Sequence, residues 1–465
     1  MRTNLLIPFL IAFLPLFSFA QNQYEIKGKI NGLRDTVVFL GNHYGEKQYL
    51  KDTAKVNSAG EFVFDGKEKL PGGIYLVIMP GKRYFEILIS DSQVFSFDTD
   101  TTDLVKAMKI KGSEENRLFY EYLRFLNPKG AKIESIRKDY DRVKDSNKDS
   151  ADAYVKQITE LDKEVKKYKS DFTVKYPKSF ISKMFKAMED PEVPEPPKLA
   201  DGKPDSTWKF YYFRAHYFDG LDLADDRLLR TPIYHSRMKY YLEKLVPQIP
   251  DSLTKAIDEI VEKARPNPET FKYVIYWTTY TYETSNIMGF DAIFVHLVQK
   301  YYKTKQVTWL SEEQMKKILE RADKLSYTLL GKKPVPLKLN TLDNKPVAFY
   351  DLKAKYTLLY FWDPDCGHCK KVTPKVLETY HKYKNKGFEV YAICIDQKLE
   401  PMKKYVEENK LDWINVSDPA HQSNFRYYYD IYSTPVLYLL NEKKEIVMKR
   451  ITDEQLEEYL KEKLK

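Results

Sequence analysis

Two cysteines stand at the junction between an apolar stretch and a helical pattern in the last third of the chain. The apolar stretch is Tyr356–Trp362, and Cys366-Gly367-His368-Cys369 open a helical pattern that runs to about Lys384. A thiolate at a helix N-terminus faces unpaired backbone N–H groups and the positive end of the helix dipole, which lower the pKa of the thiol. This position predicts that Cys366 is a redox nucleophile and that a protonated His368 adds positive charge beside its sulfur.

The second cysteine has the spacing of a resolving thiol. Cys369 lies three residues on, close enough to attack a mixed disulfide at Cys366 and release the substrate. The alternative is half of a zinc site, which usually needs a second Cys or His pair. The third cysteine, Cys394, lies inside the apolar run Phe388–Ile395 and is expected to be a buried thiol. We therefore expect no metal, and no cofactor beyond the disulfide of Cys366 and Cys369.

A proline stands directly before another apolar run. Pro435 follows Tyr432-Ser433-Thr434 and leads into Val436–Leu440. Because proline cannot donate a hydrogen bond to a neighbouring strand, it marks the beginning of the strand and is a candidate for a cis peptide bond. Pro374 falls inside the helical pattern after the cysteines, where it should kink the helix.

These residues together resemble a known family. Phe361-Trp362, the C-x-x-C pair, Pro374 and Thr434-Pro435 match, in order and spacing, the signature of the thioredoxin fold. From about residue 332 to the C-terminus the chain is similar to thioredoxin-fold thiol-disulfide oxidoreductases, an AhpC/TSA-related superfamily. Residues 334–355 resemble the extra hairpin of its TlpA/ResA-like envelope branch. The resemblance implies that Pro435 is a cis-proline facing the cysteines, and that Thr434, Pro435 and Trp362 contact the extended substrate.

Two positions depart from the pattern of that family. Tyr360 stands where cytoplasmic thioredoxins have a buried acid, and Val372 stands where ResA-like reductases have an active-site glutamate. Asp363 and Asp365 flank the motif and are the candidate proton acceptors for Cys369, although carboxylates before a helix often serve as caps. The Gly-His dipeptide resembles that of protein disulfide isomerases, a more oxidising class. The fold branch, in contrast, favours a reductase.

The N-terminus predicts export. Arg2 precedes the apolar stretch Leu5–Phe17, and Ser18-Phe19-Ala20 follow with a small-x-small pattern suited to signal peptidase. The stretch is too short for a membrane span of about 20 residues. Cleavage after Ala20 predicts a periplasmic protein without a membrane span. Its expected partners are exported proteins with disulfides or thiols and, if it is a reductase, an inner-membrane electron donor.

Net charge gives little support to a nucleic-acid partner. The formal charge of +9 comes from 76 basic and 67 acidic residues, so the excess is small relative to the total. Export weakens the case further, and we expect no nucleic acid among the partners.

The composition and patterning predict a multidomain chain. Short alternating runs separated by turn signals predict an N-terminal antiparallel β domain, sandwich or barrel-like, at 21–112. Helical periodicity predicts a central all-α domain at 113–331, which includes a long exposed helical hairpin over the charged run 132–169. The C-terminal α/β thioredoxin fold takes 332–465. Both upstream regions resemble modules of unknown function in Gram-negative envelope proteins.

Two local patterns in the helical region give specific expectations. Asp251-Ser252 should cap a helix whose apolar face begins at Leu253 and which ends before Pro266. An aromatic stripe, Tyr273, Tyr276, Trp277 and Tyr280, has the spacing of a helix face that packs in a core, and a sugar or peptide platform is the alternative.

The leading function is a periplasmic thiol-disulfide oxidoreductase that reduces, or alternatively isomerises, protein disulfides. A second hypothesis is an envelope protein that binds peptide or glycan and uses its thioredoxin domain for docking, which would not need both cysteines. A thiol peroxidase is disfavoured, because that family wants Thr or Ser three residues before the nucleophile, where Asp363 stands.

Overall fold

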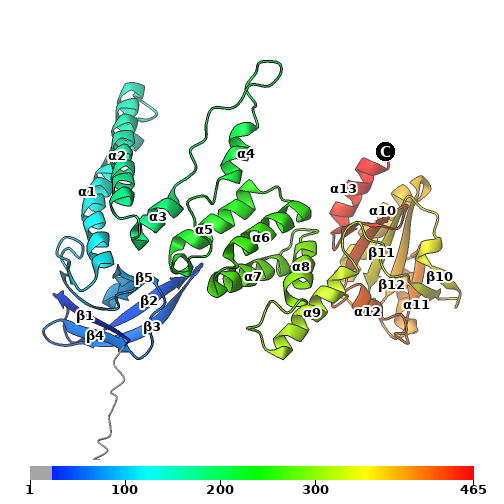
Figure 1. Ribbon diagram of the computed structural model, residues 1–465. Helices are drawn as coiled ribbons and strands as arrows, with labels where there is room; N and C mark the ends of the chain where they lie inside the picture. Colours follow the sequence, from blue (N-terminus) through cyan, green and yellow to red (C-terminus); the bar gives the residue numbers. More distant parts are fainter. Residues whose placement is uncertain (1–22) are drawn as a thin grey trace, which may run out of the picture. The chain divides into compact units, whose positions relative to one another are not determined.

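The computed structural model describes residues 23–465 of the 465-residue chain (Figure 1). The predicted signal peptide, residues 1–20, lies outside the described residues. The chain forms two compact units whose boundary falls between Tyr241 and Leu242. This boundary lies within the stretch 113–331, so the helical residues are shared between the units and the domain limits at 112 and 331 stay predictions.

The first unit begins with two four-stranded sheets, ordered β4-β1-β7-β8 and β3-β2-β5-β6. The strands are β1 (Tyr24–Asn31), β2 (Thr36–Tyr44), β3 (Lys47–Val56), β4 (Glu61–Gly66), β5 (Gly73–Ile78), β6 (Tyr84–Ile89), β7 (Val94–Asp100) and β8 (Lys109–Lys111). Phe85 of β6 meets Phe97 of β7 edge to face, with ring centroids 5.4 Å apart, so the sheets share an aromatic core.

Strand pairing in these sheets departs from the sequence-based expectation at one place. β1 pairs with β4 antiparallel on one side and with β7 parallel on the other, with Ile26 opposite Phe95. The remaining pairs in the two sheets are antiparallel. The antiparallel β domain is therefore confirmed except for the parallel β1–β7 pair, which a sequence pattern of alternating residues cannot reveal.

Helices complete the first unit. They are α1 (Glu114–Val143), α2 (Lys148–Lys175), α3 (Phe180–Met188), α4 (Trp208–Ala215), the short 3-10 helix η2 (Asp226–Arg230) and α5 (Pro232–Tyr240). α1 and α2 form the predicted exposed hairpin, and the side chain of Asn147 caps α2 by accepting the N–H of Ser150 at 3.0 Å.

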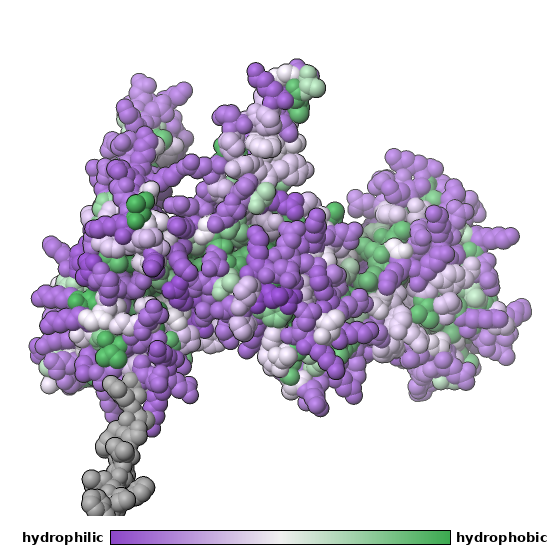
Figure 2. Space-filling view, in the orientation of Figure 1, coloured by the Kyte–Doolittle hydropathy of each residue, from purple (hydrophilic) through white to green (hydrophobic). Residues whose placement is uncertain are grey.

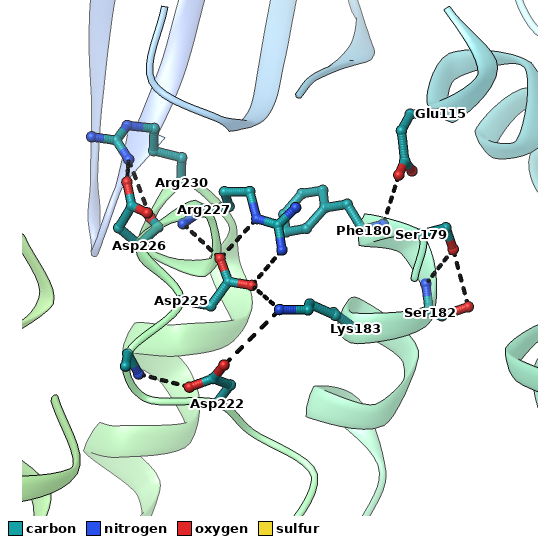
Figure 3. Close-up of polar contacts among 11 residues, drawn as sticks. Glu115, Ser179, Phe180, Ser182, Lys183, Asp222, Asp225, Asp226, Arg227 and Arg230 are labelled. Carbon is teal, nitrogen blue, oxygen red and sulfur yellow. Dashed lines mark hydrogen bonds and ion pairs between the residues drawn. The ribbon is translucent and has the colours of Figure 1, made fainter. Parts of the chain in front are cut away.

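Polar contacts around the buried carboxylate of Asp225 connect α3 to η2 (Figure 3). The Asp225 carboxylate accepts hydrogen bonds from Arg227 Nη2 at 2.6 Å and from Lys183 Nζ at 2.9 Å. Glu115 of α1 accepts the backbone N–H of Phe180 at 2.9 Å at the start of α3. Because buried carboxylates need partners, these contacts fix the helices of this unit to one another.

The second unit contains a helical part and a mixed sheet. Its helices are α6 (Pro250–Ala264), α7 (Pro268–Glu283), α8 (Asp291–Leu297), α9 (Glu312–Ser326), α10 (Gly367–Tyr383), α11 (Leu399–Glu408), α12 (Phe425–Tyr428) and α13 (Asp453–Lys463). Its strands are β9 (Lys338–Thr341), β10 (Pro346–Ala348), β11 (Tyr356–Trp362), β12 (Phe388–Cys394), β13 (Ile414–Ser417), β14 (Val436–Asn441) and β15 (Ile446–Lys449).

The sheet of the second unit has seven strands in the order β10-β9-β13-β12-β11-β14-β15. β11 runs parallel to β12 and antiparallel to β14. Side chains of β11 enter the core on both faces, with Leu358 and Trp362 on one side and Leu359 and Phe361 on the other. Burial on both faces explains why this strand is continuously apolar in the sequence. The sheet and its helices have the predicted thioredoxin fold, and they set the carboxyl end of β11 at the start of α10.

Polar and charged side chains cover most of the face shown in Figure 2. Within residues 23–465, no helix combines the length and the apolar character needed to cross a membrane.

Candidate functional site

Cys366 occupies the N-cap position of α10 with an extended backbone, φ −74° and ψ 117°. Its Sγ accepts a hydrogen bond from the backbone N–H of Cys369 at 3.3 Å. Asp363 closes the turn between β11 and α10: its carbonyl accepts the N–H of Cys366 at 3.2 Å, and its carboxylate accepts the N–H of Asp365 at 2.8 Å. The short turn therefore holds the sulfur at the positive end of the helix, as the sequence predicts.

The two cysteine side chains differ in ionisation. Burial acts to raise the pKa of the Cys366 thiol, but hydrogen bonds from the Cys369 backbone N–H and the Thr434 side chain outweigh it, so the pKa lies below its ordinary value. The Cys369 side chain is 1% exposed, and burial raises the pKa of its thiol to about 12. One sulfur of the pair is therefore biased towards the thiolate, and the other keeps its proton at neutral pH.

The loop before β14 closes the site on the other side. The peptide bond between Thr434 and Pro435 is cis, which is the conformation that the resemblance implies. The Thr434 carbonyl accepts the Cys366 Sγ–H at 3.3 Å. This contact joins segments 68 residues apart, because β14 pairs with β11 and sets Val436 opposite Phe361.

The other predicted site residues divide between surface and core. His368 is exposed in the first turn of α10, and Asp365 is exposed before it, while Asp363 is half-buried. Trp362 is 0% exposed and packs on Tyr405, with ring centroids 5.2 Å apart. A ring without exposed surface cannot touch a substrate, so the predicted substrate contact of Trp362 is wrong and its place is in the core.

A buried hydroxyl pair stands close to Cys369. Tyr360 Oη and Thr373 Oγ1 lie 2.7 Å apart, and both side chains are 0% exposed. Thr373 is four residues after Cys369 on α10 and so lies on the same face of the helix. Burial raises the pKa of Tyr360 far above its ordinary value, so this phenol stays neutral. In the sequence, Tyr360 stands out only as a departure from the family, and the one signal for Thr373 is its four-residue spacing from Cys369.

Cys394 is a buried thiol, as predicted. It is 1% exposed at the end of β12, opposite Trp362 in the parallel register, and burial raises the pKa of its thiol to about 12. Across residues 23–465, no group of three or more His, Cys, Asp or Glu side chains is arranged to hold a metal ion.

Family models match three parts of the chain. A thioredoxin-like family matches residues 354–446. Two families described as domains of unknown function, DUF4369 and DUF5106, match residues 24–119 and 145–325. The matched ranges follow the order of the β, helical and thioredoxin-like regions.

Individual proteins are also similar to parts of this chain. The thiol-disulfide oxidoreductase ResA of Bacillus cereus is 31% identical over 134 residues, which cover 28% of this chain and 76% of that protein. A solved domain of a "possible thiol-disulfide isomerase" from Cytophaga hutchinsonii is 42% identical, covers 29% of this chain and 92% of that one, and has a TM-score of 0.28. A thioredoxin-like protein from Bacteroides caccae is 20% identical, with coverages of 59% and 99% and a TM-score of 0.45.

The match to the thioredoxin-like family, at residues 354–446, covers the strand-to-helix turn, the buried second cysteine and the cis-proline loop. The chain therefore belongs to the ResA-like thiol-disulfide oxidoreductases of the thioredoxin-like superfamily, with additional domains upstream.

Proposed function

We propose that this protein is a periplasmic reductase of protein disulfides that works through Cys366-Gly367-His368-Cys369. The observation that carries the proposal is the asymmetry of the two sulfurs. Cys366 is partly exposed at the N-terminus of α10 with a lowered pKa, and Cys369 is buried with a raised pKa. This is the arrangement that a nucleophile and a resolving thiol require.

In the first step, the Cys366 thiolate attacks one sulfur of a substrate disulfide. A bond forms between Cys366 Sγ and that sulfur, the substrate S–S bond breaks, and the other substrate sulfur leaves as a thiolate. The loop at Thr434 and cis Pro435 lies against Cys366, and we assign the binding of the extended substrate backbone to it. His368 is exposed beside the sulfur and would favour the anion when it is protonated.

In the second step, Cys369 attacks Cys366 Sγ in the mixed disulfide. The protein disulfide forms, the second substrate sulfur leaves, and the two electrons that reduce the substrate come from the two protein thiols. Cys369 must lose its proton in this step. Of the two candidate carboxylates, we retain Asp363 as the acceptor, because it is half-buried and its backbone N–H faces the Cys369 sulfur. Asp365 is exposed.

The cycle then needs a dithiol that returns two electrons to the disulfide. An inner-membrane electron donor is the proposed source, and exported proteins with disulfides are the proposed substrates. The location rests on the N-terminal sequence, and the mass of the mature protein purified from its own cell envelope tests it. A chain beginning at Gln21 is expected, and retention of residues 1–20 would contradict cleavage after Ala20.

Reduction of insulin disulfides with dithiothreitol as the electron source tests the chemistry. Cys366→Ser should abolish turnover, and Cys369→Ser should accumulate a mixed disulfide with insulin, visible by non-reducing electrophoresis. Cys394→Ser is the matched control and should retain turnover, because Cys394 takes no part in either step. A wild-type rate equal to that of dithiothreitol alone would overturn the proposal.

A further inference from the structure

Helix α9 contacts the loop that carries the cis-proline. Asp430, which lies in this loop, is 0% exposed and accepts Arg321 Nη1 of α9 at 2.6 Å and Arg450 Nη2 at 2.7 Å. A carboxylate held by two guanidinium groups gives charge-assisted hydrogen bonds, which are stronger than neutral ones. The helix that precedes the thioredoxin-like fold is thus bound directly to the loop beside the redox pair.

Further contacts fix the helical part of the second unit to the edge of the sheet. The backbone of Gly331 donates to Ile446 of β15 at 2.8 Å, and Ile446 donates back to Lys332 at 2.9 Å. Lys449 of β15 is 7% exposed, pairs with Asp291 of α8 and donates to the Thr328 carbonyl at 2.8 Å. α9 is therefore held in a fixed position within this unit.

An aromatic ring of the cis-proline loop is exposed beside α9. Tyr432 is 64% exposed, and Lys324 of α9 donates to its hydroxyl at 3.2 Å. The Lys324 ammonium and the Arg321 guanidinium also lie 5.4 and 5.8 Å from the ring centroid. Cation–π contacts of this kind hold a ring in place while leaving its outer surface open. A rigid exposed aromatic side chain is the type of anchor that protein interfaces favour.

The ring belongs to the loop that contacts the reacting sulfur. Tyr432 precedes Thr434 by two residues, so their Cα atoms are at most about 7.6 Å apart. The Thr434 carbonyl is 3.3 Å from Cys366 Sγ. A substrate chain that reacts at this sulfur and runs along the loop therefore reaches Tyr432 and Lys324 within a few residues of its cysteine, since an extended chain advances by about 3.3 Å per residue.

The charges of α9 at this place indicate what would bind there. Asp430 is matched by two arginines, and the carboxylate of Asp323 accepts the Tyr427 hydroxyl at 2.5 Å. The Glu320 carboxylate lies 3.8 Å from Lys316. Lys324 has three N–H donors, of which one is directed to Tyr432. Its remaining donors can take a carboxylate from a substrate.

We propose that Tyr432 and Lys324 form a docking surface for the polypeptide that carries the target cysteine, and that the surface selects an acidic side chain about three residues from that cysteine. The proposal rests on the proposed function, because it takes Cys366 as the reacting group. It gives the helical region a role in choosing the substrate: the last helix before the thioredoxin-like fold supplies Lys324 and positions Tyr432.

Binding of two labelled peptides to the full mature chain tests this surface without redox chemistry. The peptides carry Ser in place of cysteine and differ only in Glu or Lys three residues away. Fluorescence anisotropy should show that the Glu peptide binds roughly two- to fivefold more tightly, the range of an exposed ion pair. The preference should disappear in about 1 M salt, where exposed charges are screened.

Variants then show which residues cause the preference for the Glu peptide. Lys324→Glu should remove or reverse it, and Tyr432→Ala should weaken both peptides. Lys353→Glu makes the same charge change at the opposite end of β11 and should keep the wild-type preference. Equal binding of the two peptides by the wild type, or a preference that survives Lys324→Glu, would overturn the proposal. Reduction of uncharged hydroxyethyl disulfide by the wild type separately tests the proposed function. Failure of the docking proposal is therefore distinguishable from failure of the proposed redox function.

Discussion

The hydroxyl groups of Tyr360 and Thr373 lie 2.7 Å apart in the core, one helical turn beyond Cys369. Tyr360 stands where the cytoplasmic thioredoxins that this segment resembles have a buried acid, and both side chains of the pair lack exposed surface. A neutral hydrogen bond in this place supports the packing of α10 on β11. It cannot serve as a strong base, because burial keeps the tyrosine protonated.

Tyr360→Phe should therefore lower the free energy of unfolding by about 1 kcal/mol, because the buried Thr373 hydroxyl loses its hydrogen bond to Tyr360. Thr373→Val should cost a similar amount. The double variant should lose less than the sum, since neither hydroxyl is then left alone. Urea unfolding of the four proteins measures the coupling, and strictly additive losses would contradict the hydrogen bond.

The lowered pKa of Cys366 predicts alkylation at unusually low pH. In a Cys369→Ser, Cys394→Ser background, the rate of reaction with iodoacetamide should reach half its maximum below pH 9, the ordinary value for a thiol. Cys369, tested in the Cys366→Ser background, should react slowly up to much higher pH, because its pKa is raised to about 12. Equal profiles for the two cysteines would contradict the assigned roles.

Among the carboxylates of the loop, Asp430 should contribute most to the stability of the fold. Asp430→Asn removes the charge that two arginines share and should lower the free energy of unfolding by about 2 kcal/mol. Asp430→Ala should cost about 1 kcal/mol more, since this residue has φ 54° and alanine tolerates the left-handed region poorly. Urea unfolding measures both, with Glu462→Gln, an exposed charge on α13, as the control that should change little.

Asp258 predicts a dependence of stability on acid pH. Burial acts to raise its pKa, but hydrogen bonds from His296, Lys300 and Tyr301 outweigh this and lower the pKa from 3.8 to about 2. A carboxylate with a depressed pKa stabilises the fold above its unfolded pKa and loses that contribution as pH falls through the folded one. The stability advantage of the wild type over Asp258→Asn should thus shrink between about pH 4 and 2. Thermal unfolding across this range measures it, and a constant difference would contradict the depressed pKa.

The sequence predicts the redox turn because its local signals agree. The apolar run of β11, the two cysteines and the helical periodicity of α10 each indicate the same junction, and the structure has it. Pro435 likewise precedes a strand and adopts the cis bond. In such segments the local sequence pattern and the tertiary packing favour the same structure. The structure of these segments can therefore be predicted from the sequence.

Other elements lie beyond local patterns. β3 cannot be recognised in the sequence, because it is an edge strand whose first five residues, Lys47 to Lys51, are exposed and show no apolar alternation. The predicted cap of α6 at Asp251-Ser252 was wrong by two residues, since the helix begins at Pro250, a residue favoured in the first turn. The contacts of Arg321 with Asp430 join residues 109 apart, and no periodicity indicates them.

The aromatic stripe of α7 contains both buried and exposed rings, which the spacing of its residues does not distinguish. Tyr273 and Trp277 are buried, as a core face predicts. Tyr276 and Tyr280 are 54% and 56% exposed and stack on each other, with ring centroids 6.3 Å apart. Residues three and four positions apart on a helix lie on only roughly the same face. One stripe can therefore contain both buried and exposed side chains.

The reduction potential of the Cys366/Cys369 pair distinguishes a reductase from an oxidase or isomerase. Purified mature protein is equilibrated with glutathione and dithiothreitol buffers, and the fraction of disulfide is measured by thiol alkylation and mass spectrometry. A reductase should have a reduction potential near or below about −250 mV. A value between about −180 and −120 mV would contradict the reductase assignment and indicate an oxidase or isomerase, and failure of the disulfide to form would contradict redox catalysis by this pair.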